Sequence, residues 1–218
     1  MKDTKDYYFS DAKHLILDIP VPHQKMLSEA INLRHRFTDH RPNEHSHKGW
    51  KSLTLYGLDE NRHENWNIEG YSSALDAAKD FKWTQAAYDC PTILDFLRNT
   101  FPSKRYGRVR LMLVEPGGYI GFHSDTKYRI LENINIPLSN PKNCIWHWGD
   151  GEKFFMEPGI PYAVNISYEH SVTNDSDEDR YHLIVARHDS TDEWKQLIND
   201  ASRKYNISGY YHTDIIKV

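Results

Sequence analysis

Two metal-binding side chains stand one residue apart in the segment Gly121-Phe122-His123-Ser124-Asp125. Successive side chains of a β-strand point to opposite faces, so His123 and Asp125 project to the same side if this segment is extended. An imidazole and a carboxylate supply two ligands to a metal ion, and a third must come from elsewhere in the fold. His170, at an expected strand end, is the candidate. Two histidines and one carboxylate leave coordination positions open for other molecules.

Arg180 follows His170 by ten residues and opens the segment Arg-Tyr-His-Leu-Ile-Val-Ala, which has the pattern of a strand. A guanidinium at this position can hold a carboxylate through two charge-assisted hydrogen bonds. The alternative is a surface ion pair with the acidic residues at 175–179. His182 shares a face with Arg180 by alternation, and we expect it to support Arg180 rather than to replace His170 as a ligand.

A His-x-Asp pattern alone often arises by chance, and its alternative interpretation is a surface turn at the end of a strand. A second histidine pair, His45 and His47, lies in the polar, turn-rich stretch 38–49. No cysteine or third ligand accompanies this pair. We therefore expect a solvated or substrate-facing loop there rather than a zinc site.

The composition predicts a polar, globular chain with one domain. It has 218 residues, 39% hydrophobic residues and a formal charge of −4, which gives no electrostatic argument for a nucleic-acid or membrane partner. Apolar runs are far shorter than the roughly 20 residues of a membrane span, and the N-terminus lacks a signal-like apolar region. Cys90 and Cys144 lie far apart in unlike contexts, so we expect no disulfide framework and a cytoplasmic, reducing location.

The elements that must position these side chains follow from hydrophobic periodicity. Alternation at Val109, Leu111 and Leu113 predicts one strand. A Pro-Gly-Gly turn at 116–118 follows it and leads into a second strand, which ends at the His-x-Asp pair. Further strands are expected near 15–19, 50–58, 130–138, 144–148, 153–156, 162–166 and 180–186, and helices near 24–37, 72–81, 91–101 and 194–201.

The strand expected at 130–138 has an informative second face. Ile134 and Ile136 share one face, and Asn133 and Asn135 share the other. In an ordinary half-buried strand the amides would be exposed, whereas in a barrel with a polar interior they would point at a ligand. Both interpretations stay open at this stage.

Four motifs in a fixed order resemble one known family. They are Pro116-Gly117-Gly118-Tyr119-Ile120-Gly121-Phe122-His123-Ser124-Asp125, Asn135-Ile136-Pro137-Leu138, Pro158-Gly159-Ile160-Pro161-Tyr162, and His170 to Asn174 with Arg180. From about Tyr106 to Asp189 the chain is similar to the aspartyl/asparaginyl β-hydroxylase-like branch of the Fe(II)/2-oxoglutarate-dependent dioxygenases.

The resemblance implies a mainly β fold with flanking helices, built on a double-stranded β-helix, which is a jelly-roll or cupin-like barrel. It implies Fe(II) bound by His123, Asp125 and His170, and 2-oxoglutarate with its distal carboxylate at Arg180. The expected single domain spans 1–218: supporting helices and strands at 1–105, the barrel core at 106–189, and a helix and tail at 190–218.

The reaction implied is hydroxylation of a C–H bond by O2, with release of succinate and CO2. The expected substrate is an amino-acid side chain, free or within a peptide or protein. Asn133, Asn135 and His182 are candidate further contacts to the co-substrate, although members of this family often carry Arg or His at positions comparable to the two asparagines.

For the substrate, Arg108 or Arg110 is a candidate for binding a carboxylate, and Trp146 and Trp148 are candidates for shaping the pocket. A cupin-like, non-redox metal-binding protein or isomerase is the alternative function, and it would favour four metal ligands and no carboxylate clamp. A barrel without catalysis, serving as an interaction module, would take up no metal.

Overall fold

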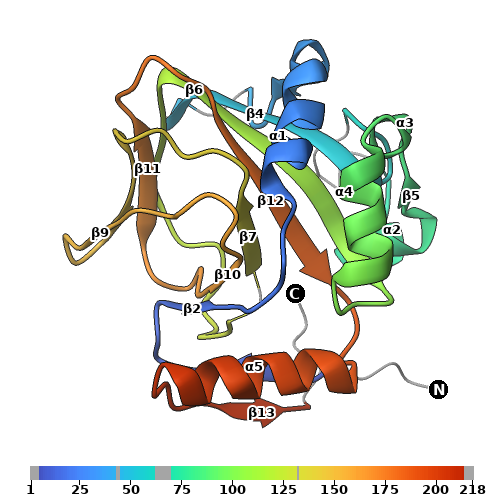
Figure 1. Cartoon of the computed structure of the whole chain (residues 1–218), viewed down its shortest axis with the longest axis vertical. Helices are drawn as coiled ribbons and strands as arrows, with labels where there is room; N and C mark the ends of the chain where they lie inside the picture. Colours follow the sequence, from blue (N-terminus) through green and yellow to red (C-terminus); the bar gives the residue numbers. More distant parts are fainter. Residues whose placement is uncertain (1–4, 43–44, 62–69, 132, 214–218) are drawn as a thin grey trace.

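The computed structural model describes residues 5–42, 45–61, 70–131 and 133–213 (Figure 1). Its strands are β1 (Tyr7–Phe9), β2 (His14–Ile16), β3 (Thr38–Asp39), β4 (His47–Gly57), β5 (Lys82–Trp83), β6 (Tyr106–His123), β7 (Asn133–Pro137), β8 (Cys144–Trp148), β9 (Lys153–Phe154), β10 (Tyr162–Val164), β11 (His170–Asn174), β12 (Arg180–Arg187) and β13 (Tyr210–His212). The α-helices are α1 (His23–Asn32), α2 (Ala74–Ala77), α3 (Gln85–Tyr88), α4 (Pro91–Asp95) and α5 (Asp192–Lys204), with 3₁₀ turns at Arg34–Arg36 and Ala78–Asp80 and a π-helical turn at Phe96–Thr100.

The strand β6 organises the barrel because it belongs to both of its walls. Its first half pairs with β12; β12 pairs with β7, β7 with β10, and β10 with β2, and we call this set the first wall. Its second half pairs with β11, followed by β8 and β9, and we call this set the second wall. Strand β4 runs beside both halves of β6. In Figure 1, β12 runs beside β6, and β11 stands at the left of the view, away from α3 and α4.

Between the two halves β6 bends at a pair of glycines. Gly117 has φ of +66°, a conformation that glycine adopts with little cost. A Cβ on Gly118 would lie 2.7 Å from the carbonyl oxygen of Glu115 and 2.8 Å from that of Lys48. The sequence predicted a turn between two strands here, and the structure instead has one continuous strand with a bend.

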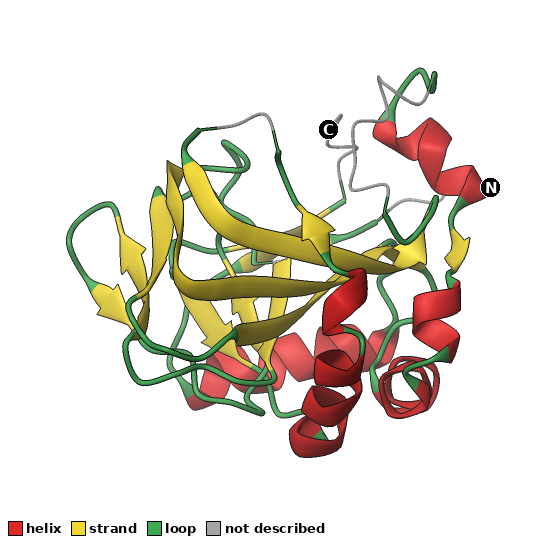
Figure 2. Ribbon diagram, turned by 90° about the horizontal axis from the view of Figure 1, so that it is seen from above, coloured by secondary structure: helices red, strands yellow, loops and turns green. Residues whose placement is uncertain are grey.

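Two clusters of buried side chains lie on opposite faces of the first wall. Leu111, Leu183 and Ile136 belong to the larger cluster, which also contains Met26 of α1 and Trp194 of α5. The smaller cluster joins the two walls across the barrel interior and contains Val114, Ile120, Cys144, Trp146, Trp148, Met156, Tyr162, Val164 and Val172. Side chains of the first wall therefore alternate between the helix-covered outer face and the barrel interior. Figure 2 shows the helices outside the strands rather than between them.

This arrangement is the predicted mainly β, jelly-roll type of barrel with flanking helices. The helix predicted at 24–37 ends at Asn32 and continues as a 3₁₀ turn, and the strand predicted at 15–19 is His14–Ile16. The stretch 38–49, expected to be a loop, contributes β3 and the first residues of β4. Cys90 and Cys144 are both free and buried. Within the described residues, no helix is long and apolar enough to cross a membrane.

Candidate metal and carboxylate site

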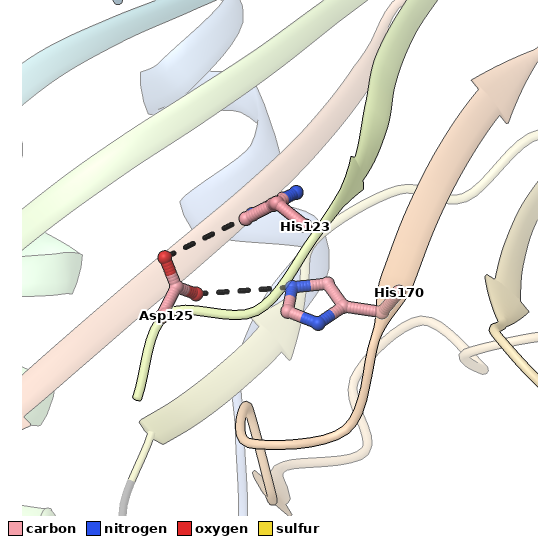
Figure 3. A group of neighbouring side chains, drawn as sticks. All are labelled: His123, Asp125 and His170. Carbon is pink, nitrogen blue, oxygen red and sulfur yellow. Dashed lines mark ion pairs between the residues drawn. The ribbon is translucent and has the colours of Figure 1, made fainter. Parts of the chain in front are cut away.

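The structure brings His123, Asp125 and His170 together at the end of the barrel away from the β6 bend (Figure 3). His123 is the last residue of β6 and pairs in register with His170, the first residue of β11. One ligand atom from each of the three side chains lies within 4.8 Å of the others. The Asp125 carboxylate faces both rings, with Oδ1 3.8 Å from Nε2 of His123 and Oδ2 3.8 Å from Nε2 of His170.

Asp125 reaches this position by a different route from the one predicted. Strand alternation was expected to place His123 and Asp125 on one side, but β6 ends at His123 and Asp125 lies in a bend beyond it. The Asp125 backbone N–H donates to the Ile166 carbonyl at 3.0 Å, which fixes the bend against the segment that precedes β11. Its carboxylate is therefore positioned by tertiary contact.

Both histidines are oriented by a hydrogen bond from the ring to the backbone carbonyl two residues earlier in the chain. Nδ1 of His123 lies 2.8 Å from the Gly121 carbonyl oxygen, and Nδ1 of His170 lies 2.8 Å from the Tyr168 carbonyl oxygen. A carbonyl only accepts, so each Nδ1 carries the proton, and each Nε2 presents a lone pair. Burial lowers the pKa of His170, which favours the neutral, metal-binding imidazole. The donor set thus fits a divalent metal ion, whose histidine ligands commonly donate their other N–H to the protein.

Trp146 supports the second histidine from the barrel interior. Its indole stacks on the His170 ring with 4.6 Å between ring centroids and 8° between planes. The indole N–H of Trp146 is buried and has no hydrogen-bond partner within the described part of the chain. Trp148 is also buried and meets His170 edge to face at 6.3 Å. Both tryptophans therefore line the site from the second wall, as the sequence suggested for a pocket.

Arg180, the first residue of β12, lies in the barrel interior. It is 5% exposed, and none of the described carboxylates pairs with it. The predicted alternative, a surface ion pair with residues 175–179, is wrong, because Asp179 pairs with Arg34 instead. Arg180 donates through Nε to Oδ1 of Asn140 at 3.3 Å and through Nη2 to Nδ1 of His182 at 3.0 Å. Burial lowers the pKa of the guanidinium, the mark of a cation removed from water without a counter-ion.

His182 is fully buried, and its hydrogen bond with Arg180 determines its tautomer. The guanidinium only donates, so Nδ1 of His182 accepts and Nε2 carries the proton. This Nε2 has no partner in the described residues. Arg180 and His182 thus present buried N–H donors that an acceptor such as a carboxylate would satisfy. His182 is not one of the clustered metal-ligand candidates.

The remaining predicted residues have different surroundings. Asn135 is buried and donates its side-chain N–H to Oδ1 of Asn133 at 3.0 Å, so the two amides form a pair on the interior face of β7. Arg108 and Arg110 are both partly exposed on β6, and the Arg110 guanidinium lies 3.5 Å from Nε2 of His40. Of the histidine pair at 45 and 47, His45 is exposed, and both lie outside the metal-ligand cluster.

A row of rings along β4 reaches the candidate metal ligands, and His47 comes from the stretch that was expected to be a solvated or substrate-facing loop. His47 contacts His123 with 6.1 Å between ring centroids, and Trp50 contacts His47 at 4.8 Å. His40 contacts Trp50 at 4.2 Å and shares a 2.9 Å hydrogen bond with Ser52. The alternation of Trp50 and Ser52 with Leu53 was the available signal, but His40, which contacts both Trp50 and Ser52, comes from the segment after β3.

Comparison with known proteins bears directly on this site. The model of the aspartyl/asparaginyl β-hydroxylase family matches residues 22–189. The chain belongs to this family. The aspartyl/asparaginyl β-hydroxylase match spans α1 to β12 and so includes the metal cluster, the guanidinium of Arg180 and much of the part before residue 106 that the sequence resemblance did not reach. It confirms the predicted family and, with it, the prediction of a hydroxylase of the dioxygenase class.

Several solved structures are also similar to this aspartyl/asparaginyl β-hydroxylase family member. A prolyl-4-hydroxylase from Pseudomonas putida is 15% identical, with 81% of this chain and 94% of that chain covered and a TM-score of 0.42. A prolyl hydroxylase from Trichoplax adhaerens, in complex with a peptide of hypoxia inducible factor, is 12% identical over 81% and 83%, with a TM-score of 0.46. A cupin domain from Bordetella pertussis Tohama I is 20% identical over 39% and 84%, with a TM-score of 0.32. No curated protein matches the chain.

Proposed function

We propose that this protein is an Fe(II)- and 2-oxoglutarate-dependent hydroxylase of an amino-acid side chain, free or within a peptide or protein. His123, Asp125 and His170 would hold the iron, and Arg180 would bind the distal carboxylate of 2-oxoglutarate. The observation that carries the proposal is the pairing of a three-ligand cluster with a buried guanidinium that has no carboxylate partner among the described residues. When bound, iron and 2-oxoglutarate supply oxidative decarboxylation to succinate and CO2, coupled to hydroxylation by O2.

The protein's own residues orient the ligands and exclude water. The two backbone carbonyls that accept from the histidine Nδ1 atoms fix the ring planes before any metal arrives. Apolar side chains that join the two walls, among them Val114, Val172 and Trp146, would keep bulk water away from a co-substrate bound between the candidate metal ligands and Arg180. In such a site the attraction between the guanidinium and a carboxylate is stronger than in water.

His182, Asn133 and Asn135 are proposed as further contacts of the co-substrate. His182 is the best supported, because its Nε2–H is buried without a described partner beside Arg180. The two asparagines face the interior from β7, where their remaining oxygen and N–H groups suit either the co-substrate or the substrate. We also propose that residues 1–218 act as one domain in the cytoplasm, where a reducing environment suits ferrous iron and the two free cysteines.

The alternative of a cupin-like, non-redox metal protein predicts metal binding without any use of 2-oxoglutarate. A barrel that serves only for interaction predicts neither. The described cluster has three candidate ligands rather than four, and the interior carries a carboxylate-binding group, so the oxygenase is favoured.

The test is formation of succinate from 2-oxoglutarate with Fe(II) and O2, together with the bound iron measured on the same samples. Asp125→Ala and His170→Ala should each abolish succinate formation and weaken iron binding at least about 10-fold. Asp200→Ala, which removes an exposed carboxylate on α5, is the matched control and should change neither. Unchanged succinate formation in both ligand variants would refute the assignment, and iron binding with no decarboxylation would favour the non-redox alternative.

A further inference from the structure

The interior face of β8 runs from the Arg180 end of the barrel to the metal end. Cys144, Trp146 and Trp148 belong to the cluster that fills the barrel interior, and they alternate along the strand with residues that do not. Trp148 pairs in register with His170 of β11. Trp146 is thus the middle one of three interior residues, with about 7 Å of strand on either side of it.

Cys144 lies at the Arg180 end of this face. The side chain of Asn140 donates to the Cys144 carbonyl at 3.2 Å and accepts from Nε of Arg180 at 3.3 Å, so a single amide joins the two residues. A co-substrate that reaches from Arg180 to a metal held by His170 would therefore pass beside the interior face on which Trp146 lies.

The Trp146 indole reaches the metal end of the site through its stack on His170. The ring centroids are 4.6 Å apart and the ring planes are 8° from parallel. The indole N–H lies in its own ring plane, so it does not point at the face of the imidazole, and none of the described groups accepts from it. A buried N–H without an acceptor costs about 1–3 kcal/mol, and folded proteins seldom leave one. An acceptor on a bound ligand would remove that cost.

We propose that the Trp146 indole N–H donates to an oxygen of the keto-acid end of 2-oxoglutarate, so that Trp146 contacts the co-substrate and does more than fill the interior. The proposal rests on the proposed function. The stack places the indole beside a ligand of the proposed metal, whose open positions the keto-acid end would fill, whereas Arg180 would meet the distal carboxylate. Trp146 and Arg180 would therefore act on opposite ends of the same molecule.

Two ligands separate these contacts. 2-Oxopentanoate has the keto-acid end of 2-oxoglutarate but a methyl group in place of the distal carboxylate. Trp146→Phe keeps an aromatic ring beside His170 and removes the N–H, so its Kd for both ligands should rise about 10- to 100-fold, the range for one hydrogen bond to a charged group. In Arg180→Met only 2-oxoglutarate should lose affinity. Each Kd is measured by calorimetric titration of Zn(II)-loaded protein without O2.

Trp194 of α5 provides the matched control. It is fully buried in the helix-covered cluster, its indole N–H also lacks a described partner, and its ring centroid lies 3.8 Å from Cζ of Arg187. An unpartnered N–H is therefore not a ligand contact by itself, and the position beside His170 is what the comparison isolates. Trp194→Phe makes the same substitution outside the barrel interior, so it should leave both Kd values unchanged even where it lowers the stability.

The indole N–H signals of the wild-type protein give a second readout, which a packing role would not move. The chain has 6 tryptophans, so a nitrogen-correlated NMR spectrum of their indole groups is simple. The Trp146 signal is assigned by its absence from Trp146→Phe or, if that variant does not fold, from Trp146→Tyr. Either ligand, added to Zn(II)-loaded protein, should move this signal downfield and slow its exchange with solvent, while the Trp194 signal stays in place.

Each result decides the matter. Weaker binding of both ligands by Trp146→Phe, together with the downfield shift in the wild type, supports the proposal. Unchanged Kd values in Trp146→Phe, a loss confined to 2-oxoglutarate, or an indole signal that responds to Zn(II) alone and to neither ligand overturns it. Wild-type protein that takes up no metal, or whose Zn(II) form does not bind 2-oxoglutarate, would show that the proposed function itself has failed, and this proposal with it.

Discussion

Replacing Arg180 by methionine should make the ligand-free protein more stable and its affinity for 2-oxoglutarate much weaker. Arg180 is 5% exposed and has no described carboxylate partner, so the folded protein bears the cost of removing a cation from water. Replacing buried ionic groups by apolar ones of similar size often gains about 1–4 kcal/mol. Losing the hydrogen bonds to Asn140 and His182 costs about 1–3 kcal/mol together. The balance is a gain of about 1 kcal/mol, or about 2–4 °C in Tm.

Under the proposed function, the same substitution would also remove two charge-assisted hydrogen bonds from Arg180 to the distal carboxylate of 2-oxoglutarate. At about 1.5 kcal/mol or more each, their loss should raise the Kd for 2-oxoglutarate at least about 100-fold. Urea unfolding of the metal-free protein measures the first effect, and calorimetric titration of 2-oxoglutarate into Zn(II)-loaded protein without O2 measures the second. Arg129→Met, an exposed arginine paired with Asp11, should change neither quantity. A variant that is destabilised by more than 1 kcal/mol while its Kd is unchanged would show that Arg180 serves the fold and not the ligand.

Two further predictions concern the β6 bend and His188, the residue that follows β12. Gly118→Ala should lower the free energy of unfolding by about 2–4 kcal/mol and weaken iron binding, because the new Cβ would lie less than 3 Å from two backbone oxygens. Gly117→Ala has open space around its Cβ and should lower it by only about 1–2 kcal/mol, the cost of its positive φ. Equal losses of the two variants in urea unfolding would contradict this reasoning. Burial lowers the pKa of His188 to about 4, so between pH 6.5 and 4 the unfolded state binds a proton that the folded state does not. The free energy of unfolding should therefore fall by about 2 kcal/mol between pH 6.5 and pH 4, after allowance for the partly hydrated ring. In His188→Gln this fall should be absent when unfolding curves are measured at both pH values.

The metal-ligand candidates could be chosen from the sequence because residue type and spacing carried the information, although the local reason given for one of them was wrong. His123 and His170 were expected at strand ends, and the pairing of β6 with β11, which the sequence did not predict, brings them together. Asp125 lies beyond the strand, held by the Ile166 carbonyl, and alternation alone would not have placed it. The residue types were informative because imidazoles and carboxylates are common metal ligands, and a second histidine and an arginine follow the His-x-Asp pattern.

Long-range register is what the sequence could not provide. The acidic residues beside Arg180 in the sequence suggested a surface ion pair, but Asp179 is drawn to Arg34 on another segment and leaves the guanidinium inside the barrel. Likewise, nothing in the stretch 38–49 indicates that His40 lies beside Arg110, seventy residues away. Such contacts depend on how β4 pairs with β6, and that pairing contains register shifts that a two-residue period does not predict.

The continuity of β6 explains how the barrel can hold a metal cluster and a carboxylate clamp at a defined separation. One strand carries His123 at its end, the bend at Gly117 in its middle, and Val114, the register partner of Arg180, just before the bend. The separation between His123 and Arg180 is therefore set by hydrogen-bonded strand. Under the proposed function, 2-oxoglutarate would be bound only if this separation matches its length, so a rigid strand would provide selectivity that the metal and the guanidinium alone would lack.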